Sequence, residues 1–309
     1  MTSEIGEFLR AKRERVAPEE RGLPAGGQRR VPGLRREEVA LLAGISPDYY
    51  VRLEQGRARA ASDQVLDAIS RVLSLDDVER DHLRVLARPA TPLRAVRAAP
   101  APGTRPGLTA LLDAMPQVPA FVLGPAMDVL AVNLLGDALI ALPEGPRNMA
   151  RHVFLDPTSP AYYPEWDKVA RETAAHLRRM AGLLPDTPEI AALIGELTIG
   201  SDEFVRAWAR QEVAVKTHGR KLVDHPEIGR LSLAYETLAL PDEPALMLVT
   251  YTAADERTAD ALRTLGSWAA SGTAERADER TADERTADER TAERSPRPGD
   301  LPRTPAAER

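Results

Sequence analysis

The stretch LRREEVALLAGISPDYYVRLEQGR, residues 34–57, decides how the N-terminal part of the chain folds. Its first half has apolar residues at helical spacing, which form the inward side of one helix: Leu34, Val39, Ala40 and Ala43. Gly44 follows and predicts the end of this helix, because glycine readily takes the positive φ that is favoured at a helix C-terminus. Ser46 and Pro47 then begin a second helix, which we expect to reach about Gln55, since a hydroxyl caps the helix and a first-position proline loses no hydrogen bond.

The two predicted helices are separated by Ile45 and Ser46 alone, so they must cross sharply. A sharp crossing requires small or apolar residues at the contact, and the segment provides them as a set: Val39, Ala40, Ala43, Gly44, Ile45, Tyr50 and Leu53. This is the pattern of a helix-turn-helix motif. An ordinary helical hairpin with no role in nucleic-acid binding explains the same buried positions, but it gives no reason for the surrounding arginines.

Charge is distributed unevenly along the chain, whose net charge is −6. Residues 10–59 carry twelve Lys and Arg against seven Asp and Glu, a net charge of +5, whereas residues 108–270 carry fourteen against twenty-two, a net charge of −8. A local basic region indicates phosphate contact even where the whole chain is acidic. The two regions therefore face different partners, and we expect the N-terminal one to bind double-stranded DNA.

Length and composition allow one large or two ordinary globular domains, because 309 residues with 43% hydrophobic content suffice for real cores. No apolar run approaches the roughly 18 residues of a membrane span, and the chain starts with a charged amphipathic segment rather than a signal sequence. We therefore expect a cytoplasmic protein with no membrane partner. The absence of cysteine excludes disulfides, thiolate catalysis and thiolate-bound metals.

Two segments have compositions that do not favour a packed core. Residues 91–107 are rich in Pro, Ala and Gly and are predicted to be a linker between domains at 1–90 and 108–270. Residues 271–309 repeat DERTA with a period of five, which matches neither helix nor strand and predicts a disordered tail. A short charged helix, supported by opposite charges three or four residues apart, is the alternative for this tail.

The segment GLPAGGQRRVPGLRREEVALLAGISPDYYVRLEQGR, residues 22–57, resembles the lambda-repressor-like, XRE-type regulators, and more narrowly the MmyB-like regulators common in actinobacteria. The similarity extends through residue 270 and implies an all-α, five-helix N-terminal bundle followed by an α+β, PAS-like ligand-binding domain. Residues IGEFLRAKRERV, SDQVLDAISRVL and DDVERDHLRVLA are amphipathic and supply the other three helices of that bundle.

In such regulators the second helix of the motif lies in the major groove. Because Tyr50 and Leu53 point inward, the side chains left on the outer face of this helix are our candidates for base contacts: Asp48, Tyr49, Arg52 and Gln55. Arg52 is the first choice, because its planar fork matches the two acceptors of guanine. Asp48 has an alternative role as an acidic residue that stabilises the helix N-terminus.

Phosphate contacts are assigned to arginines that flank the motif and would fix its register on the duplex: Arg29, Arg30, Arg35, Arg36, Arg57 and Arg59. Arg35 and Arg36 stand at the start of the first helix, where backbone N–H groups already favour an anion.

The second domain has a weaker but readable pattern. AFVLGP and DVLAVN predict two short strands, and RLSLAYETLAL and ALMLVTYTA predict a later hairpin. Helical patterns lie between them, in PEWDKVARETAAHLRRMAGLL, PEIAALIGEL and SDEFVRAWARQEV. Asn133 is similar to a PAS pattern, with a role as helix N-cap as the alternative.

The resemblance implies that this domain binds a small, largely apolar, fatty-acid-like effector and needs no other cofactor. Our candidates are three aromatic residues for the walls and four polar residues for a head group: Trp166, Phe204 and Trp208, and Arg151, His152, Lys221 and His225. Ordinary core packing is the alternative for the aromatic residues, and solvated surface is the alternative for the polar ones.

An enzyme is not expected, because the chain lacks the GxSxG, HExxH, GxxxxGK and strand-associated GxGxxG patterns. A metal site formed by His218, Asp224 and His225 would need further ligands that the sequence does not place. The sequence thus predicts a ligand-responsive, homodimeric DNA-binding regulator. The competing hypothesis is a constitutive regulator whose C-terminal domain only dimerises.

Overall fold

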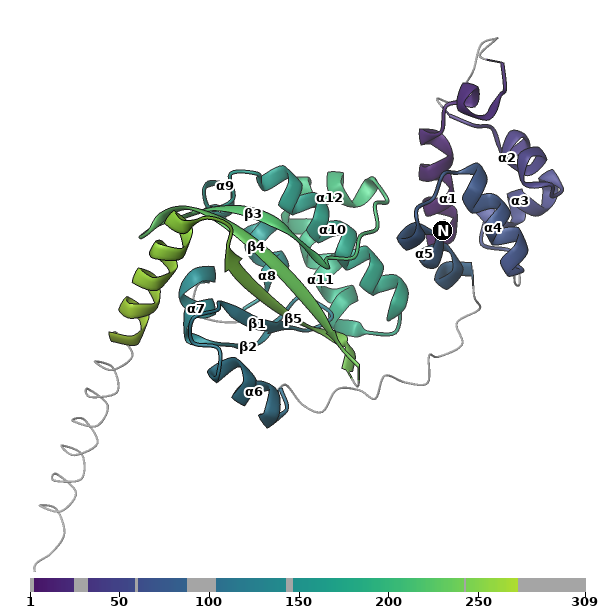
Figure 1. Ribbon diagram of the computed structural model, residues 1–309. Helices are drawn as coiled ribbons and strands as arrows, with labels where there is room; N and C mark the ends of the chain where they lie inside the picture. Colours follow the sequence, from purple (N-terminus) through teal and green to yellow (C-terminus); the bar gives the residue numbers. More distant parts are fainter. Residues whose placement is uncertain are drawn as a thin grey trace, which may run out of the picture.

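The computed structural model describes residues 3–24, 33–58, 61–87, 104–142, 147–241 and 243–271. Most of the predicted linker and all of the predicted tail after residue 271 lie outside these residues. Figure 1 shows a helical N-terminal domain and an α+β C-terminal domain, as the sequence predicts. No helix among the described residues is both long and apolar enough to cross a bilayer.

The N-terminal domain is the predicted bundle of five α-helices, with one 3-10 turn. Its elements are α1 (Glu4–Arg15), the turn η1 (Pro18–Arg21), α2 (Arg36–Ala43), α3 (Pro47–Glu54), α4 (Asp63–Val72) and α5 (Asp77–Ala87). The side chains of Ser3, Ser46 and Ser62 cap α1, α3 and α4 by accepting a hydrogen bond from a backbone N–H. The core gathers the apolar sides of all five helices, including the fully buried Phe8 and Ile69.

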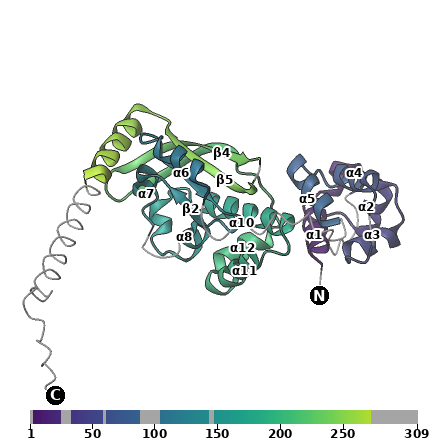
Figure 2. The ribbon, with the colours of Figure 1, turned by 90° about the horizontal axis from the view of Figure 1, so that it is seen from below.

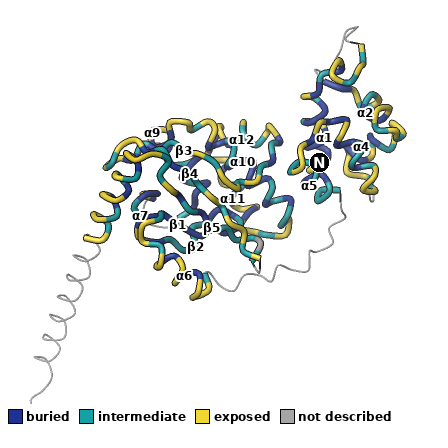
Figure 3. Tube along the Cα trace, viewed as in Figure 1, coloured by how far each residue is buried: buried dark blue, intermediate teal, exposed yellow. Residues whose placement is uncertain are grey.

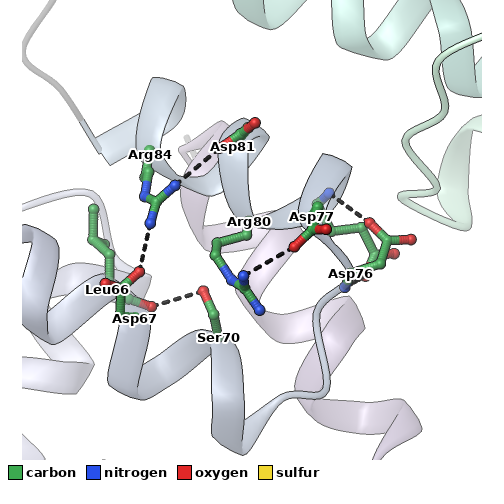
Figure 4. Close-up of polar contacts among 9 residues, drawn as sticks. Leu66, Asp67, Ser70, Asp76, Asp77, Arg80, Asp81 and Arg84 are labelled. Carbon is green, nitrogen blue, oxygen red and sulfur yellow. Dashed lines mark hydrogen bonds and ion pairs between the residues drawn. The ribbon is translucent and has the colours of Figure 1, made fainter.

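An ion pair on the outside of the bundle connects α4 to α5, and others lie within α5 (Figure 4). Arg84 of α5 donates to Asp67 of α4 at 2.7 Å and to Asp81 of its own helix at 3.0 Å. Asp76 begins α5 by accepting a hydrogen bond from the backbone N–H of Glu79 at 2.8 Å, while the Glu79 carboxylate accepts from the backbone N–H of Asp76 at 3.3 Å. This reciprocal pair is a capping box, which satisfies two N–H groups that a helix start leaves free.

The C-terminal domain is built on a five-stranded antiparallel sheet in the order β2-β1-β5-β4-β3. The strands are β1 (Ala120–Leu123), β2 (Val129–Val132), β3 (His218–His225), β4 (Gly229–Leu240) and β5 (Glu243–Ala253). Four of them were predicted and confirm the PAS-like interpretation, but β3 was not. The prediction of four strands is therefore corrected to five.

Helices cover both faces of this sheet. They are α6 (Pro106–Asp113), α7 (Leu134–Ile140), α8 (Met149–Leu155), α9 (Ser159–Tyr162), α10 (Trp166–Leu183), α11 (Pro188–Gly200), α12 (Asp202–Ala209) and a helical segment at 256–271. Side chains alternate along a strand, so Ala120 and Val122 of β1 face Leu108 of α6, whereas Phe121 joins the larger core under α7 to α12. Figure 3 shows that the helices bury their inner sides and expose their outer turns.

The two domains contact each other through α1 and α5 on one side and α10 with the segment 210–213 on the other (Figure 2). Val213 is 7% exposed and packs within the apolar core of the N-terminal bundle. Arg15 hydrogen-bonds the backbone carbonyl of Arg210 and lies 3.9 Å from a carboxylate oxygen of Glu212. The side-chain amide of Gln211 donates to Glu7 at 3.4 Å. Segment 210–213 therefore belongs to the C-terminal domain in sequence and packs against the N-terminal domain.

Candidate nucleic-acid interface and ligand cavity

The corner between α2 and α3 is fixed by two backbone hydrogen bonds at Gly44. Gly44 has φ 68° and ψ 32°, the left-handed conformation that the sequence predicts there. Its N–H donates to the carbonyl of Leu41 at 3.2 Å, and the N–H of Ile45 donates to the carbonyl of Ala40 at 3.0 Å. This pair is the Schellman arrangement, and the cap by Ser46 follows at once, with its hydroxyl accepting from the N–H of Tyr49 at 3.2 Å.

Helix α3 buries one side and exposes the other, as predicted. Tyr50 is fully buried and Leu53 is 2% exposed. Of the four side chains predicted to contact bases, Asp48, Arg52 and Gln55 are exposed, and Tyr49 is half-buried. The guanidinium carbon of Arg52 lies 5.9 Å from the centre of the Tyr49 ring, within the range of a cation–π contact. The structure thus gathers these four residues on one outer face of α3.

A buried carboxylate supports α3 from behind. The Glu54 side chain is 1% exposed, and its Oε1 lies 3.0 Å from Nη2 of Arg36, 3.4 Å from Nη2 of Arg13 and 3.7 Å from Nε of Arg10. Arg13 also donates to the carbonyl of Leu34 at 2.6 Å. Because Arg10 and Arg13 belong to α1 and Arg36 to α2, Glu54 connects these helices to α3. Removing one partner from such a buried charge cluster is costly. The sequence analysis did not identify this residue.

The predicted phosphate contacts have different surroundings. Arg35 and Arg57 are exposed, and the backbone N–H of Arg57 donates to the carbonyl of Arg52 at 2.8 Å, which fixes the chain just after α3. Arg36 is half-buried, because its guanidinium pairs with Glu54. The remaining three, Arg29, Arg30 and Arg59, lie outside the described residues.

A cavity lies between the concave face of the sheet and the helices α8 and α10. The strand register puts alternate residues of neighbouring strands on this face: Lys221 of β3 is opposite Leu233 of β4, and Tyr235 of β4 is opposite Tyr251 of β5. The walls are mainly apolar and aromatic, and they are completed by five further residues of the sheet and seven from outside it: Phe121, Leu123, Thr237, Met247 and Val249, and Met127, Met149, Val153, Tyr163, Val169, Thr173 and Lys216.

Two lysines line this cavity. Nζ of Lys216 donates to Oγ1 of Thr173 at 3.3 Å. Nζ of Lys221 lies 5.3 Å, 5.8 Å and 5.9 Å from the ring centres of Tyr163, Tyr235 and Tyr251. Burial, together with the neighbouring Lys221 cation, lowers the pKa of Lys216 to about 7, and burial lowers the pKa of Lys221 to about 8. Among the described residues, neither lysine forms an ion pair with a carboxylate.

Of the seven residues predicted to bind a ligand, the structure places Lys221 on the cavity wall. The three aromatic residues pack in the core beside it: Phe204 lies 5.1 Å from Phe154 and 5.3 Å from Trp208, ring centre to ring centre, and Trp166 donates to the carbonyl of Val153. This packing matches the alternative that the sequence left open. Lys216 and the three tyrosines were missed, because the sequence does not show which residues share a sheet face.

The other predicted polar residues have protein partners away from the cavity. Arg151 forms a two-pronged ion pair with Glu196, at 2.9 Å and 2.8 Å. Nδ1 of His152 lies 3.0 Å from a carboxylate oxygen of Asp156. Nε2 of His225 lies 3.0 Å from the carbonyl of Ala138. These contacts position the side chains within the fold.

Asn133 has the structural role that the sequence left as an alternative. Its side-chain oxygen caps α7 by accepting from the N–H of Gly136 at 2.8 Å, and its amide donates to the carbonyls of Met115 and Val118, both at 2.8 Å. Asp224, considered as a metal ligand, pairs with Arg230 at 2.7 Å. In the part of the chain that the structure describes, no three His, Asp or Glu side chains gather as metal ligands.

Comparison with known families gives two matches. Residues 4–83 match a helix-turn-helix domain. Residues 104–265 match the MmyB-like transcription regulator ligand binding domain. No curated protein matches the chain.

Proposed function

The chain belongs to the DNA-binding transcription regulators that carry an MmyB-like ligand-binding domain, and we propose that α3 reads an operator in the major groove while a small ligand in the C-terminal cavity modulates binding. The observation that carries the first part is the outer face of α3, where Arg52 is exposed and the helix is held at a fixed corner. Both matched families are regulatory domains, which agrees with the expectation that the chain is no enzyme.

The cavity supports a ligand with an apolar body and an anionic head. Its walls are apolar and aromatic, yet Lys216 and Lys221 bring two amine groups to it without a carboxylate partner among the described residues. A cation that faces an apolar cavity is normally paired, so a ligand carboxylate supplies the missing charge. The alternative of a domain that only dimerises gives these two lysines no role.

A long apolar chain requires the cavity to widen, because its volume is only about 40 Å³. Three methionines line it, Met127, Met149 and Met247, and methionine side chains have three rotatable bonds that adapt to irregular shapes. We therefore place the acyl chain of a fatty-acid-like effector along these residues.

The contact between the domains offers a route from ligand to DNA. Helix α10 carries Thr173 on the cavity wall and Gly182 beside His82 of α5, and Lys216 follows the interdomain segment 210–213 by three residues. A ligand that binds Lys216 and Thr173 therefore acts on two elements that hold the N-terminal domain. If the ligand binds more tightly when the N-terminal domain is docked, or when it is released, then it shifts the populations of these two states. Two such domains in a homodimer would then reach half-sites at a different spacing.

Selection from a pool of random duplexes tests DNA recognition. The full-length protein is expected to enrich one sequence motif at moderate salt, and recovery of the pool without enrichment would contradict the proposal.

Thermal unfolding tests ligand binding, because a ligand that binds the folded state raises the melting temperature. Straight-chain carboxylates of increasing length are expected to raise it in the wild type and to act less on Lys221→Met. The control is Lys168→Met, which removes an exposed lysine from α10. Equal shifts in both variants would contradict the role of Lys221.

A further inference from the structure

We propose that Lys216 is a covalent binding site for short apolar aldehydes, which it captures as an imine inside the C-terminal cavity. The inference rests on the proposed ligand-binding function of this domain and adds a second ligand chemistry to it.

The geometry provides a nucleophile in a suitable place. Lys216 lies in the segment between α12 and β3, and its Nζ is held beside the cavity by Oγ1 of Thr173 at 3.3 Å. No carboxylate within the described part of the chain pairs with this nitrogen. Much of the remaining cavity wall is formed by side chains that cannot stabilise an ammonium ion by hydrogen bonds, including Phe121, Val169 and Val249. An amine in such surroundings is favoured in its neutral, nucleophilic form.

A second cation strengthens this effect. Lys221 lines the same cavity, and a lysine next to another cationic group is a known arrangement for an amine that forms Schiff bases. Burial and the Lys221 cation together lower the pKa of Lys216 to about 7, so a substantial share of its side chains is neutral near pH 7. An ordinary lysine, with a pKa of about 10.4, is almost entirely protonated there.

The present size of the cavity selects a short carbonyl compound. About 40 Å³ is available. By the usual allowance for one water that is room for roughly three water molecules, hence for a carbonyl compound of only a few heavy atoms. The hydroxyl-bearing rings of Tyr163, Tyr235 and Tyr251 line the side where Lys221 lies, and their hydroxyls are protonated because burial raises the pKa of each.

The reaction needs no oxidant or reductant. The neutral Nζ of Lys216 attacks the carbonyl carbon, a C–N bond forms, and the electron pair of the C=O bond moves to oxygen, which takes a proton. The nitrogen then loses its first proton, which gives a neutral carbinolamine. Its lone pair forms the C=N bond while the hydroxyl leaves as water with another proton, and the nitrogen finally releases its second proton, so that two protons are taken up and two are released. The net change is one amine and one aldehyde giving one imine and one water.

Reductive trapping of the full-length protein tests this assignment. The protein is treated with dilute butanal and cyanoborohydride at pH 7, and the butylated lysines are mapped by mass spectrometry as a function of time. Lys216 is expected to be modified first, well before the exposed Lys168. Modification of Lys216 no faster than Lys168, or of Lys221 in its place, would overturn the inference.

Two arginine variants separate this inference from the proposed carboxylate binding. Lys216→Arg keeps the positive charge but cannot form an imine, so it is expected to lose the fast adduct, while the melting-temperature rise with carboxylates is measured on the wild type. Lys168→Arg is the matched control and is expected to keep both. If carboxylates stabilise the wild type while Lys216 shows no preference for butanal, the aldehyde site alone fails. If carboxylates have no effect and Lys216 is still trapped first, the carboxylate proposal alone fails.

Discussion

His176 is a single buried side chain that makes the stability of the C-terminal domain depend on pH. It is 1% exposed within α10, and neither ring nitrogen has a hydrogen-bond partner among the described residues. Burial, with the nearby cations Lys216 and Arg179, lowers its pKa to about 3. An unfolded histidine has a pKa of about 6.5, so between these values the unfolded chain binds one proton more than the folded chain.

The free energy of unfolding is therefore expected to fall as pH decreases from about 6.5 toward 3, by at most about 1.4 kcal/mol per pH unit for this group. Urea unfolding at several pH values measures it. His176→Leu is expected to reduce this slope, and His218→Gln, which changes an exposed histidine, is the matched control. A His176→Leu curve as steep as that of the wild type would show that the buried ring is not the cause.

Glu54 and Lys216 show why single residues of a site escape a reading of the sequence. Glu54 lies inside the segment that predicts the helix-turn-helix, but its role depends on Arg10 and Arg13, more than forty positions earlier. Lys216 faces the cavity because the sheet brings β4 and β5 beside the segment that carries it. Both roles depend on contacts with residues that are remote in the sequence, and no local pattern encodes such contacts. The exposure of Arg52, in contrast, follows from the period of one helix.

At the scale of elements, local chemistry predicts most of the fold. Gly44, Ser46 and Pro47 mark where α2 ends and α3 begins. Gly44 takes the left-handed conformation that ends a helix, the Ser46 hydroxyl accepts from a backbone N–H at the helix start, and Pro47 has no N–H that would need a partner there. Strand β3 lacks such a signal. It is an edge strand with charges in its sequence, HGRKLVDH, and charged edge strands resemble loops although they protect a sheet from further pairing.

The N-cap of α3 is an element whose contribution can be separated from general stability. Ser46→Ala and Ser62→Ala each remove one hydroxyl that accepts a hydrogen bond at a helix start, at 3.2 Å and 3.4 Å. Each is expected to destabilise the N-terminal domain by about 1 kcal/mol in urea unfolding. Only Ser46→Ala is expected to weaken operator binding as well, because α4 lies outside the proposed interface. Equal losses of operator affinity in the two variants would contradict the placement of α3 in the groove.

At the scale of the whole molecule, the contact between the domains should make their unfolding interdependent. A methyl group at Gly182 of α10 would lie 2.6 Å from Cε1 of His82, closer than two carbon atoms approach. The His82 ring has little room to move, because it packs edge-on against Phe8 at 5.2 Å. Gly182→Ala is therefore expected to push the domains apart.

Calorimetry measures the consequence. The unfolding transition of the N-terminal domain is expected at a lower temperature in Gly182→Ala than in the wild type, since it loses the burial of Val213. Gly107→Ala is the control, because a methyl group there would have no neighbour within 4 Å. The same transition temperature in both variants would mean that the domain contact does not contribute to stability.

The central claim is that the exposed edge of α3 distinguishes one DNA sequence from another, and competition binding with the selected operator tests it most directly. The ratio of affinities for the operator and a scrambled duplex is expected to fall in Arg52→Ala by roughly 5- to 150-fold, which corresponds to the roughly 1–3 kcal/mol of a two-pronged contact with guanine. Arg71→Ala removes an equal charge from the exposed surface of α4 and is expected to leave that ratio unchanged. An unchanged ratio in Arg52→Ala would contradict the account.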